Sequence, residues 1–143
     1  MPDTPAHPPA VPPLAALVGT APDHPRSLLY TCHSNSATAA RKLADLRGFA
    51  EAHGWPVLHE VYDPAPPETP RRRRIGWCTV EQLVLRGEVN TLIAPAEQEM
   101  VRTPAEQGAL RIWLRGTGTC ALYPQDCHRR YSCVQLRAKG APA

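Results

Sequence analysis

A serine at the end of a short apolar run is the residue of this chain best placed for chemistry. Residues 28–33 are rich in β-prone side chains, Ser34 follows them, and a helical pattern begins two residues later. A strand that leads into a helix ends at the carboxyl edge of a parallel sheet, where α/β folds bind their ligands. The hydroxyl of Ser34 is therefore a candidate nucleophile. The plain alternative is a serine that caps the following helix.

Clustered arginines are the second chemical feature. Arg71, Arg72, Arg73 and Arg74 are consecutive in a proline-rich loop, and Arg129 and Arg130 lie in a basic C-terminal segment. Local positive charge attracts polyanions, nucleic acid first. A solvated basic loop is the alternative for these arginines, so the charge pattern alone leaves both interpretations open.

The apolar periodicity predicts the elements that position these residues. Strands are expected at residues 27–33, 56–62, 89–94 and 119–123, and helices at residues 36–53, 75–86 and 103–116, where apolar side chains recur at threes and fours. Strands that alternate with helices form parallel sheets covered on both faces. The sequence predicts an α/β fold, a three-layer sandwich with a mainly parallel four-stranded sheet.

Composition divides the 143 residues into three parts. Residues 1–25 hold eight of the 17 prolines and are expected to form a disordered arm, with a short helical turn at residues 14–18 as a candidate element. Residues 26–124 are expected to form the domain, and residues 125–143 a basic tail. No apolar stretch is long enough to span a bilayer and no secretory signal is evident, so we expect a cytoplasmic protein with reduced cysteines and no membrane role.

A metal site is not expected. Cys120, Cys127, His128 and Cys133 are separated by six and five residues between successive cysteines, whereas structural zinc sites use two to four. We expect no metal and no other cofactor.

Residues 27–123 resemble the catalytic domain of serine recombinases, the resolvase and invertase family. The first strand of that family typically reads Tyr-Ala-Arg-Val-Ser, and here residues 30–34 read Tyr-Thr-Cys-His-Ser. Later landmarks occur in the same order: Gly-Trp at 54–55, Asp63, Arg-Ile-Gly-Trp at 74–77, Gly-Glu-Val-Asn at 87–90 and Gln-Glu-Met-Val-Arg at 98–102. The resemblance implies a resolvase-like fold.

The resemblance also implies a reaction. Ser34 takes the place of the nucleophile that attacks a DNA phosphodiester and forms a 5′-phosphoserine intermediate, and Arg74 and Arg102 take the places of two phosphate-binding arginines. Arginine suits this task because its planar guanidinium binds two phosphate oxygens and stays charged. Lys42, Arg71, Arg72, Arg73, Arg129 and Arg130 are candidate DNA contacts.

Several positions depart from the family pattern. Cys32 stands where the first strand should carry arginine, Gln98 and Glu99 replace an Asp-Arg pair, and Lys42 replaces a glutamine. Loss of one preorganised stabilising group costs about 3 kcal/mol of barrier height. After Pro124 there is no apolar stripe for the long helix that pairs subunits in complete family members.

The resulting hypothesis is a serine-recombinase-like domain with lost or weakened strand exchange. It would bind DNA, a recombinase-like protein partner, or a second copy of itself. One alternative is an active site-specific recombinase domain that uses Ser34. Another is a module that kept the fold only for protein interaction.

Overall fold

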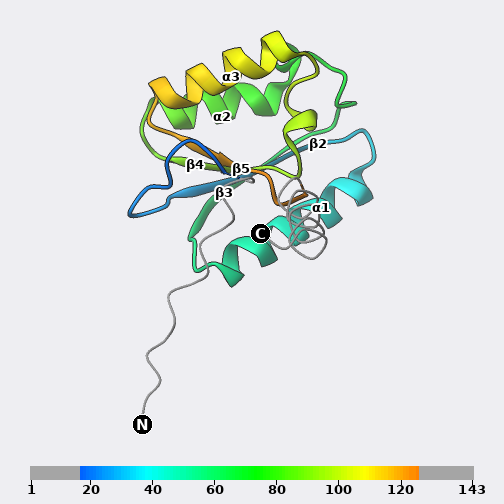
Figure 1. Cartoon of the computed structure of the whole chain (residues 1–143). Coiled ribbons are helices and arrows are strands. Elements are labelled where there is room, and N and C mark those ends of the chain that lie inside the picture. Colours follow the sequence, from blue (N-terminus) through cyan, green and yellow to red (C-terminus); the bar gives the residue numbers. More distant parts are fainter. Residues whose placement is uncertain (1–16, 126–143) are drawn as a thin grey trace, which may run out of the picture.

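The computed structural model describes residues 17–125, which form a five-stranded sheet between two layers of helices (Figure 1). The strands are β1 (Leu17–Val18), β2 (Ser27–Cys32), β3 (Val57–Asp63), β4 (Thr91–Ile93) and β5 (Cys120–Leu122). The helices are α1 (Ser36–Ala52), α2 (Ile75–Leu85) and α3 (Pro104–Gly116), with short 3-10 turns η2 (Arg71–Arg73) and η3 (Glu97–Glu99). The predicted α/β three-layer architecture is confirmed.

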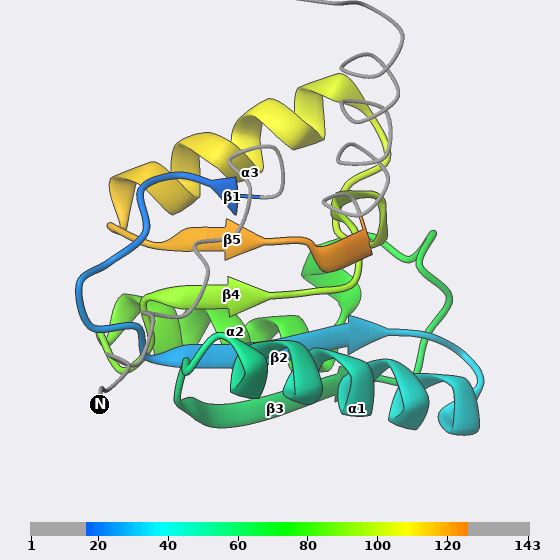
Figure 2. The same cartoon turned by 60° about the horizontal axis from the view of Figure 1, so that its bottom comes forward.

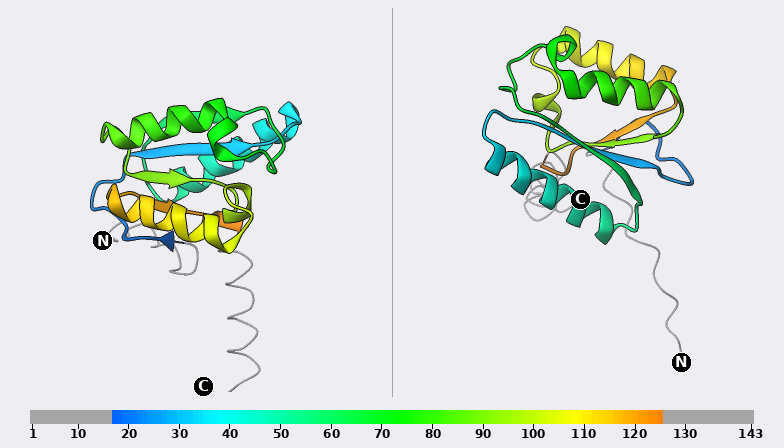
Figure 3. Two further views of the ribbon diagram at one scale, coloured as in Figure 1. Left: turned by 90° about the horizontal axis from the view of Figure 1, so that it is seen from above. Right: turned by 180° about the vertical axis from the view of Figure 1, so that it is seen from behind.

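The strand order across the sheet is β1-β5-β4-β2-β3 (Figure 2). The pairs β2–β3, β2–β4 and β4–β5 are parallel, and β1 runs antiparallel to β5. Helix α1 covers one face of the sheet, while α2 and α3 cover the other (Figure 3). Because β2, β3, β4 and β5 all run in the same direction, the loops after β2, β3 and β4 begin at the same edge of the sheet.

The sheet has five strands where four were expected. Residues 14–18 were a candidate helical turn within a disordered arm, but Leu17 pairs with Leu122 and Val18 with Ala121 as an edge strand. Gly19 permits this approach, because it has a φ of +96° and a β-carbon there would lie 3.3 Å from the Cys120 Cα. Two residues are too few to show a strand period. The rest of the expected arm, residues 1–16, and residues 126–143 of the expected tail lie outside the described part.

Helix ends follow local capping chemistry. Asn35 caps α1 and accepts a hydrogen bond from the Thr38 N–H. Gly54, with a φ of +69°, follows the end of this helix. Thr103 and Glu106 form a capping box at α3, with Pro104 in its first turn. None of the helices within residues 17–125 is long and apolar enough to cross a membrane.

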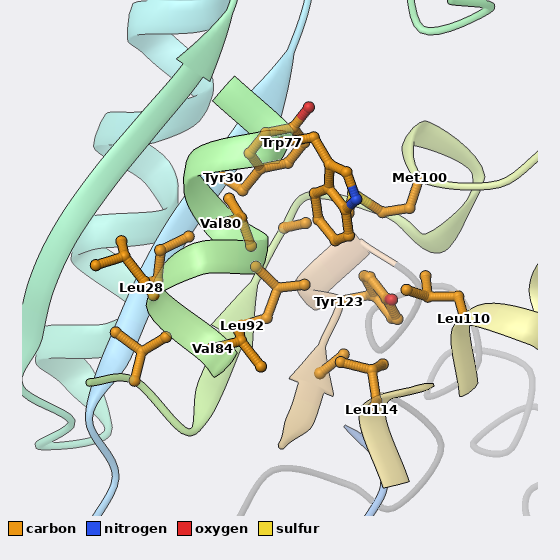
Figure 4. Packing of buried hydrophobic residues seen from close by; sticks show 14 of the residues in the cluster. Leu28, Tyr30, Trp77, Val80, Val84, Leu92, Met100, Leu110, Leu114 and Tyr123 are labelled. Atoms are coloured by element: carbon orange, nitrogen blue, oxygen red, sulfur yellow. The ribbon is translucent and has the colours of Figure 1, made fainter. Parts of the chain in front are cut away.

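The core lies on both faces of β2, because successive side chains of a strand point to opposite faces. Leu28, Tyr30 and Cys32 pack toward α2 and α3 (Figure 4), whereas Leu29 packs in the cluster under α1. Trp77 and Tyr123 are buried, and Trp55 and Trp113 are half-buried against the two clusters. Packing on both faces of this interior strand fixes where the β2–α1 loop begins.

Candidate functional site

Ser34 lies where the sequence predicts, in the loop between β2 and α1 at the carboxyl edge of the sheet. Its side chain is exposed, and no hydrogen bond of its hydroxyl occurs within residues 17–125. The neighbouring His33 accepts a hydrogen bond at Nδ1 from the Asn35 N–H, at 3.0 Å. The Nδ1 atom of His33 is therefore already hydrogen-bonded within the β2–α1 loop.

Arg74 is buried and bound to the protein itself. Only 2% of the residue is exposed. Its Nε donates to the Thr69 carbonyl at 2.8 Å, Nη2 to the Pro67 carbonyl at 2.7 Å and Nη1 to the Glu99 carbonyl at 2.9 Å. Nη1 also lies 3.4 Å from the Tyr30 hydroxyl. Each of the three guanidinium nitrogens thus has a partner inside the protein, and the group ties the loop after β3 to η3.

A buried carboxylate completes this network. The Asp63 carboxylate, at the end of β3, accepts hydrogen bonds from the Tyr30 hydroxyl at 2.5 Å, the Gly76 N–H at 2.6 Å and the Trp77 N–H at 2.9 Å. The last two donors are unpaired N–H groups of the first turn of α2, so Asp63 stabilises the start of that helix. Burial, together with the bond to Asp63, raises the pKa of Tyr30 above its usual range.

Lys42 and Glu99 form an ion pair beside the same edge. The Lys42 Nζ lies 2.6 Å from one carboxylate oxygen of Glu99, and the Thr31 hydroxyl donates to the other at 3.2 Å. Glu99 is buried, with 8% of the residue exposed. The negative charge at position 99 is therefore neutralised by the lysine of α1.

A second carboxylate of η3 is bound from α3. The Glu97 side chain accepts two hydrogen bonds from Arg111, at 3.0 and 2.8 Å, and one from the Gln107 amide at 2.6 Å. The bond to Glu97 raises the pKa of Arg111. Together with the contacts of Glu99, these bonds hold η3 between α1 and α3.

The other arginines expected at the site differ in exposure. Arg102 is exposed and its Nη2 lies 2.7 Å from the Glu68 carboxylate. Arg71 donates to the Met100 carbonyl at 2.9 Å and lies 5.5 Å from the centroid of the Trp77 ring. Burial lowers the pKa of Arg71. Arg72 and Arg73 are exposed, and their guanidinium groups make no hydrogen bond or ion pair within the described chain.

Solved structures with this arrangement of elements were found by comparison. The C-terminal catalytic domain of ISC1926 TnpA, described as an IS607-like serine recombinase, matches with a TM-score of 0.60 and 19% identity over 68% of this chain and 66% of that chain, just under two thirds of it. The N-terminal catalytic domain of TP901-1 integrase matches with a TM-score of 0.61 and 15% identity over 68% and 76%. A serine recombinase from Sulfolobus solfataricus matches with a TM-score of 0.52 and 14% identity over 80% and 83%. The chain has the fold of serine recombinase catalytic domains.

Sequence comparison adds no closer relationship. No protein-family model matches the chain, and no curated protein matches it. At these identities the structural matches concern the recombinase fold alone, so the roles of individual residues are judged from their contacts.

Within this recombinase fold, none of Arg74, Lys42 and Arg102 makes a hydrogen bond to Ser34 in the described residues 17–125. Arg74 and Lys42 both contact Glu99, one through its carbonyl and the other through its carboxylate. Arg102 lies further along the chain in an exposed pair with Glu68, and Arg129 and Arg130 lie outside the described residues. No three His, Cys, Asp or Glu side chains within residues 17–125 gather to hold a metal ion.

Sequence reasoning did not identify the partners of η3. Thr31, Glu97 and Arg111 carry no motif, and they come together only because η3 lies between α1 and α3. The available signal was the pair of carboxylates at positions 97 and 99, in a segment directly after a buried strand. Buried carboxylates require partners, so basic or hydroxyl side chains on neighbouring elements could have been sought.

Proposed function

We propose that this chain is a serine-recombinase-like domain that binds DNA and has lost or weakened strand exchange. One observation carries the proposal: Arg74 and Arg102, which the resemblance places at the scissile phosphate, and Lys42, a candidate DNA contact, are bound by groups of the chain itself. Each guanidinium nitrogen of Arg74 donates to a backbone carbonyl, Lys42 is paired with Glu99, and Arg102 is paired with Glu68.

The chemistry explains why these contacts matter. Attack of a serine hydroxyl on a phosphodiester without a metal needs cations that neutralise the phosphoryl oxygens and assist the leaving group. At position 32 the chain supplies a buried thiol, whose pKa is raised by burial, and at position 99 it supplies a carboxylate. Ser34 is exposed, and no cationic side chain donates a hydrogen bond to it within residues 17–125.

Charge distribution supports contact with DNA through two separate regions. Twelve of the 16 Lys and Arg and eleven of the 13 Asp and Glu lie in residues 17–125, so this part is almost neutral. Its exposed and unpaired cations on the loop after β3 are Arg72 and Arg73 of η2. The other four basic residues, including Arg129 and Arg130, are in residues 126–143. We infer that η2 and this C-terminal segment contact the phosphate backbone.

An NMR titration of the labelled full chain with a short DNA duplex, at two salt concentrations, tests the proposal. We expect the signals of Arg72 and Arg73 to shift, with weaker binding at the higher salt concentration, because phosphate contacts release counterions. The signals of Ser34 and Arg74 should stay unchanged. Substitution of both Arg72 and Arg73 by Gln should weaken binding, whereas Ser34→Ala should not.

Two outcomes would overturn the proposal. Concerted shifts of Ser34, Arg74 and Arg102 would show that the phosphate site still binds its ligand, and a covalent adduct lost in Ser34→Ala would then establish an active recombinase. The absence of any shift at either salt concentration would exclude the DNA contact.

A protein-interaction module is the second candidate, because α2 exposes apolar side chains. Ile75 is 84% exposed and Leu85 is 65% exposed, on a helix with Glu81 as its one charged residue. If these two exposed side chains, at opposite ends of α2, bind a recombinase-like partner or a second copy, replacing Ile75 and Leu85 by Ser should abolish co-purification or self-association while the DNA titration is unchanged.

A further inference from the structure

The carboxylate of Glu99 is bound as an anionic ligand would be. Lys42 and Thr31 donate to its two oxygens from different elements, α1 and β2. The backbone of Glu99 is itself held by Arg74, which donates to its carbonyl at 2.9 Å. The carboxylate is therefore presented to Lys42 by a rigid segment.

The donors around Glu99 are suited to an oxyanion. Lys42 and Thr31 donate to different oxygens of the same carboxylate, and a phosphate offers the same kind of anionic acceptor oxygens to ammonium and hydroxyl donors. Thr31 lies three positions before Ser34, so this donor pair belongs to the carboxyl edge where the fold binds ligands. Of the two donors, Lys42 also lines a pocket of about 90 Å³, together with Asp45, Leu46, Pro95, Pro124 and Gln125.

We propose that the Glu99 carboxylate is a built-in occupant of an oxyanion site formed by Lys42 and Thr31, and that it keeps a phosphate group out of this site. The proposal deepens the proposed function and rests on it for the identity of the excluded ligand, a phosphate of the DNA backbone. Glu99 excludes that ligand in two ways. It occupies both donors, and its negative charge repels a second anion at short range.

An internal carboxylate competes effectively because it is tethered. A group held next to its partner acts at a high effective concentration, which a free anion must exceed to displace it. When this carboxylate is removed, the ammonium group of Lys42, whose side chain is 24% exposed, loses its counter-ion in a half-buried position. A half-buried cation without a partner favours an anion from solution.

The test is a titration of the Glu99→Gln chain with inorganic phosphate at constant ionic strength, followed by NMR signals of Thr31 and Lys42. We expect saturable shifts in this variant and an affinity at least about tenfold above that of the unsubstituted chain, because one repulsive charge is removed at short range. The Lys42→Met, Glu99→Gln double variant should not show this increase in phosphate affinity.

Glu60→Gln is the matched control. It removes the same charge and frees Arg47, which also lies on α1 and pairs with Glu60 through contacts of 2.6 and 2.7 Å. This control should not gain phosphate affinity at Thr31 or Lys42. An equal increase in phosphate affinity in Glu60→Gln would mean that the change in net charge alone causes the effect, and it would overturn the proposal.

A second variant distinguishes a Glu99→Gln chain that does not fold from a folded chain that does not bind phosphate. Glu99→Asp keeps the charge but withdraws the carboxylate from Lys42, so it should show a phosphate affinity between those of Glu99→Gln and the unsubstituted chain. A folded Glu99→Gln or Glu99→Asp chain without any gain contradicts the proposal. The phosphate titration uses no DNA. A DNA titration without shifts would contradict the proposed function, but the result of the phosphate titration would still test the role of Glu99.

Discussion

At the scale of single residues, the buried polar groups of this chain serve folding more directly than chemistry. Asp63 joins the end of β3 to the first turn of α2, and its bond to Tyr30 links both to β2. Gly76 is part of this arrangement, because a β-carbon at that position would lie 2.8 Å from an Asp63 carboxylate oxygen. Two landmarks of the recombinase resemblance, the Asp after β3 and the Gly at the start of α2, thus have a packing explanation.

Gly76→Ala should destabilise the protein. The added methyl group must displace the buried Asp63 carboxylate, and overpacking of this kind costs about 1–3 kcal/mol. The free energy of unfolding from urea titration measures the effect. Gly48→Ala is the control, because a β-carbon there contacts nothing within 4 Å and alanine in a helix interior gains up to about 1 kcal/mol. Equal losses in the two variants would contradict this account.

At the scale of elements, α3 depends on the capping box at its N-terminus. Glu106 accepts hydrogen bonds from the backbone N–H groups of Arg102 and Thr103, and the bond from Arg102 is the main cause that lowers the pKa of Glu106. A pKa lowered by folding means that the carboxylate stabilises the folded state above its ordinary pKa. This stabilisation is lost as the pH falls through the lowered value.

Glu106→Gln should therefore reduce the pH dependence of stability in the acid range. The amide keeps an acceptor oxygen for the capping bonds but does not titrate, so the loss of stability between pH 7 and pH 3, followed by thermal unfolding, should be smaller than in the unsubstituted chain. Glu51→Gln on α1, where the carboxylate accepts no hydrogen bond within residues 17–125, is the charge-matched control. An unchanged profile in Glu106→Gln would contradict the role of the cap.

At the scale of the whole molecule, β1 protects one edge of the sheet. Leu17 and Val18 cover the free side of β5 and pack against the two core clusters, one on each face. The opposite edge is β3, whose outer side has no paired strand within residues 17–125. Unpaired edges promote association with other chains, and β1 replaces the edge of β5 by an edge strand of only two residues.

Comparison of two truncated chains isolates the contribution of β1. A chain that begins at residue 19 should be less stable than one that begins at residue 17 by about 1–2 kcal/mol, because two half-buried apolar side chains are lost. It should also aggregate more readily, as light scattering during thermal unfolding would show. Identical unfolding of the two chains would mean that β1 adds nothing to the sheet.

The sequence by itself determined the helices, the parallel strands and the position of Ser34. These features depend on local patterns: apolar periods of two and of three to four residues, caps at the helix ends, and the alternation of strands with helices. The two-residue strand β1 could not be predicted in this way, because it pairs with residues of β5 that lie more than a hundred positions away. Two residues are also too few to show the alternating apolar pattern of a strand.

Only the tertiary structure decided what the charged residues do. The sequence placed Arg74 and Lys42 as cations near a phosphate and Glu99 as a charge reversal, and it contained no sign that the three share one cluster. The partner of a charge depends on distance and burial, which arise when η3 packs between α1, α3 and the loop after β3. The contacts of these side chains therefore depend on how the elements pack and could not be predicted from the sequence. The fold could be predicted, because it follows from the order of strands and helices along the chain.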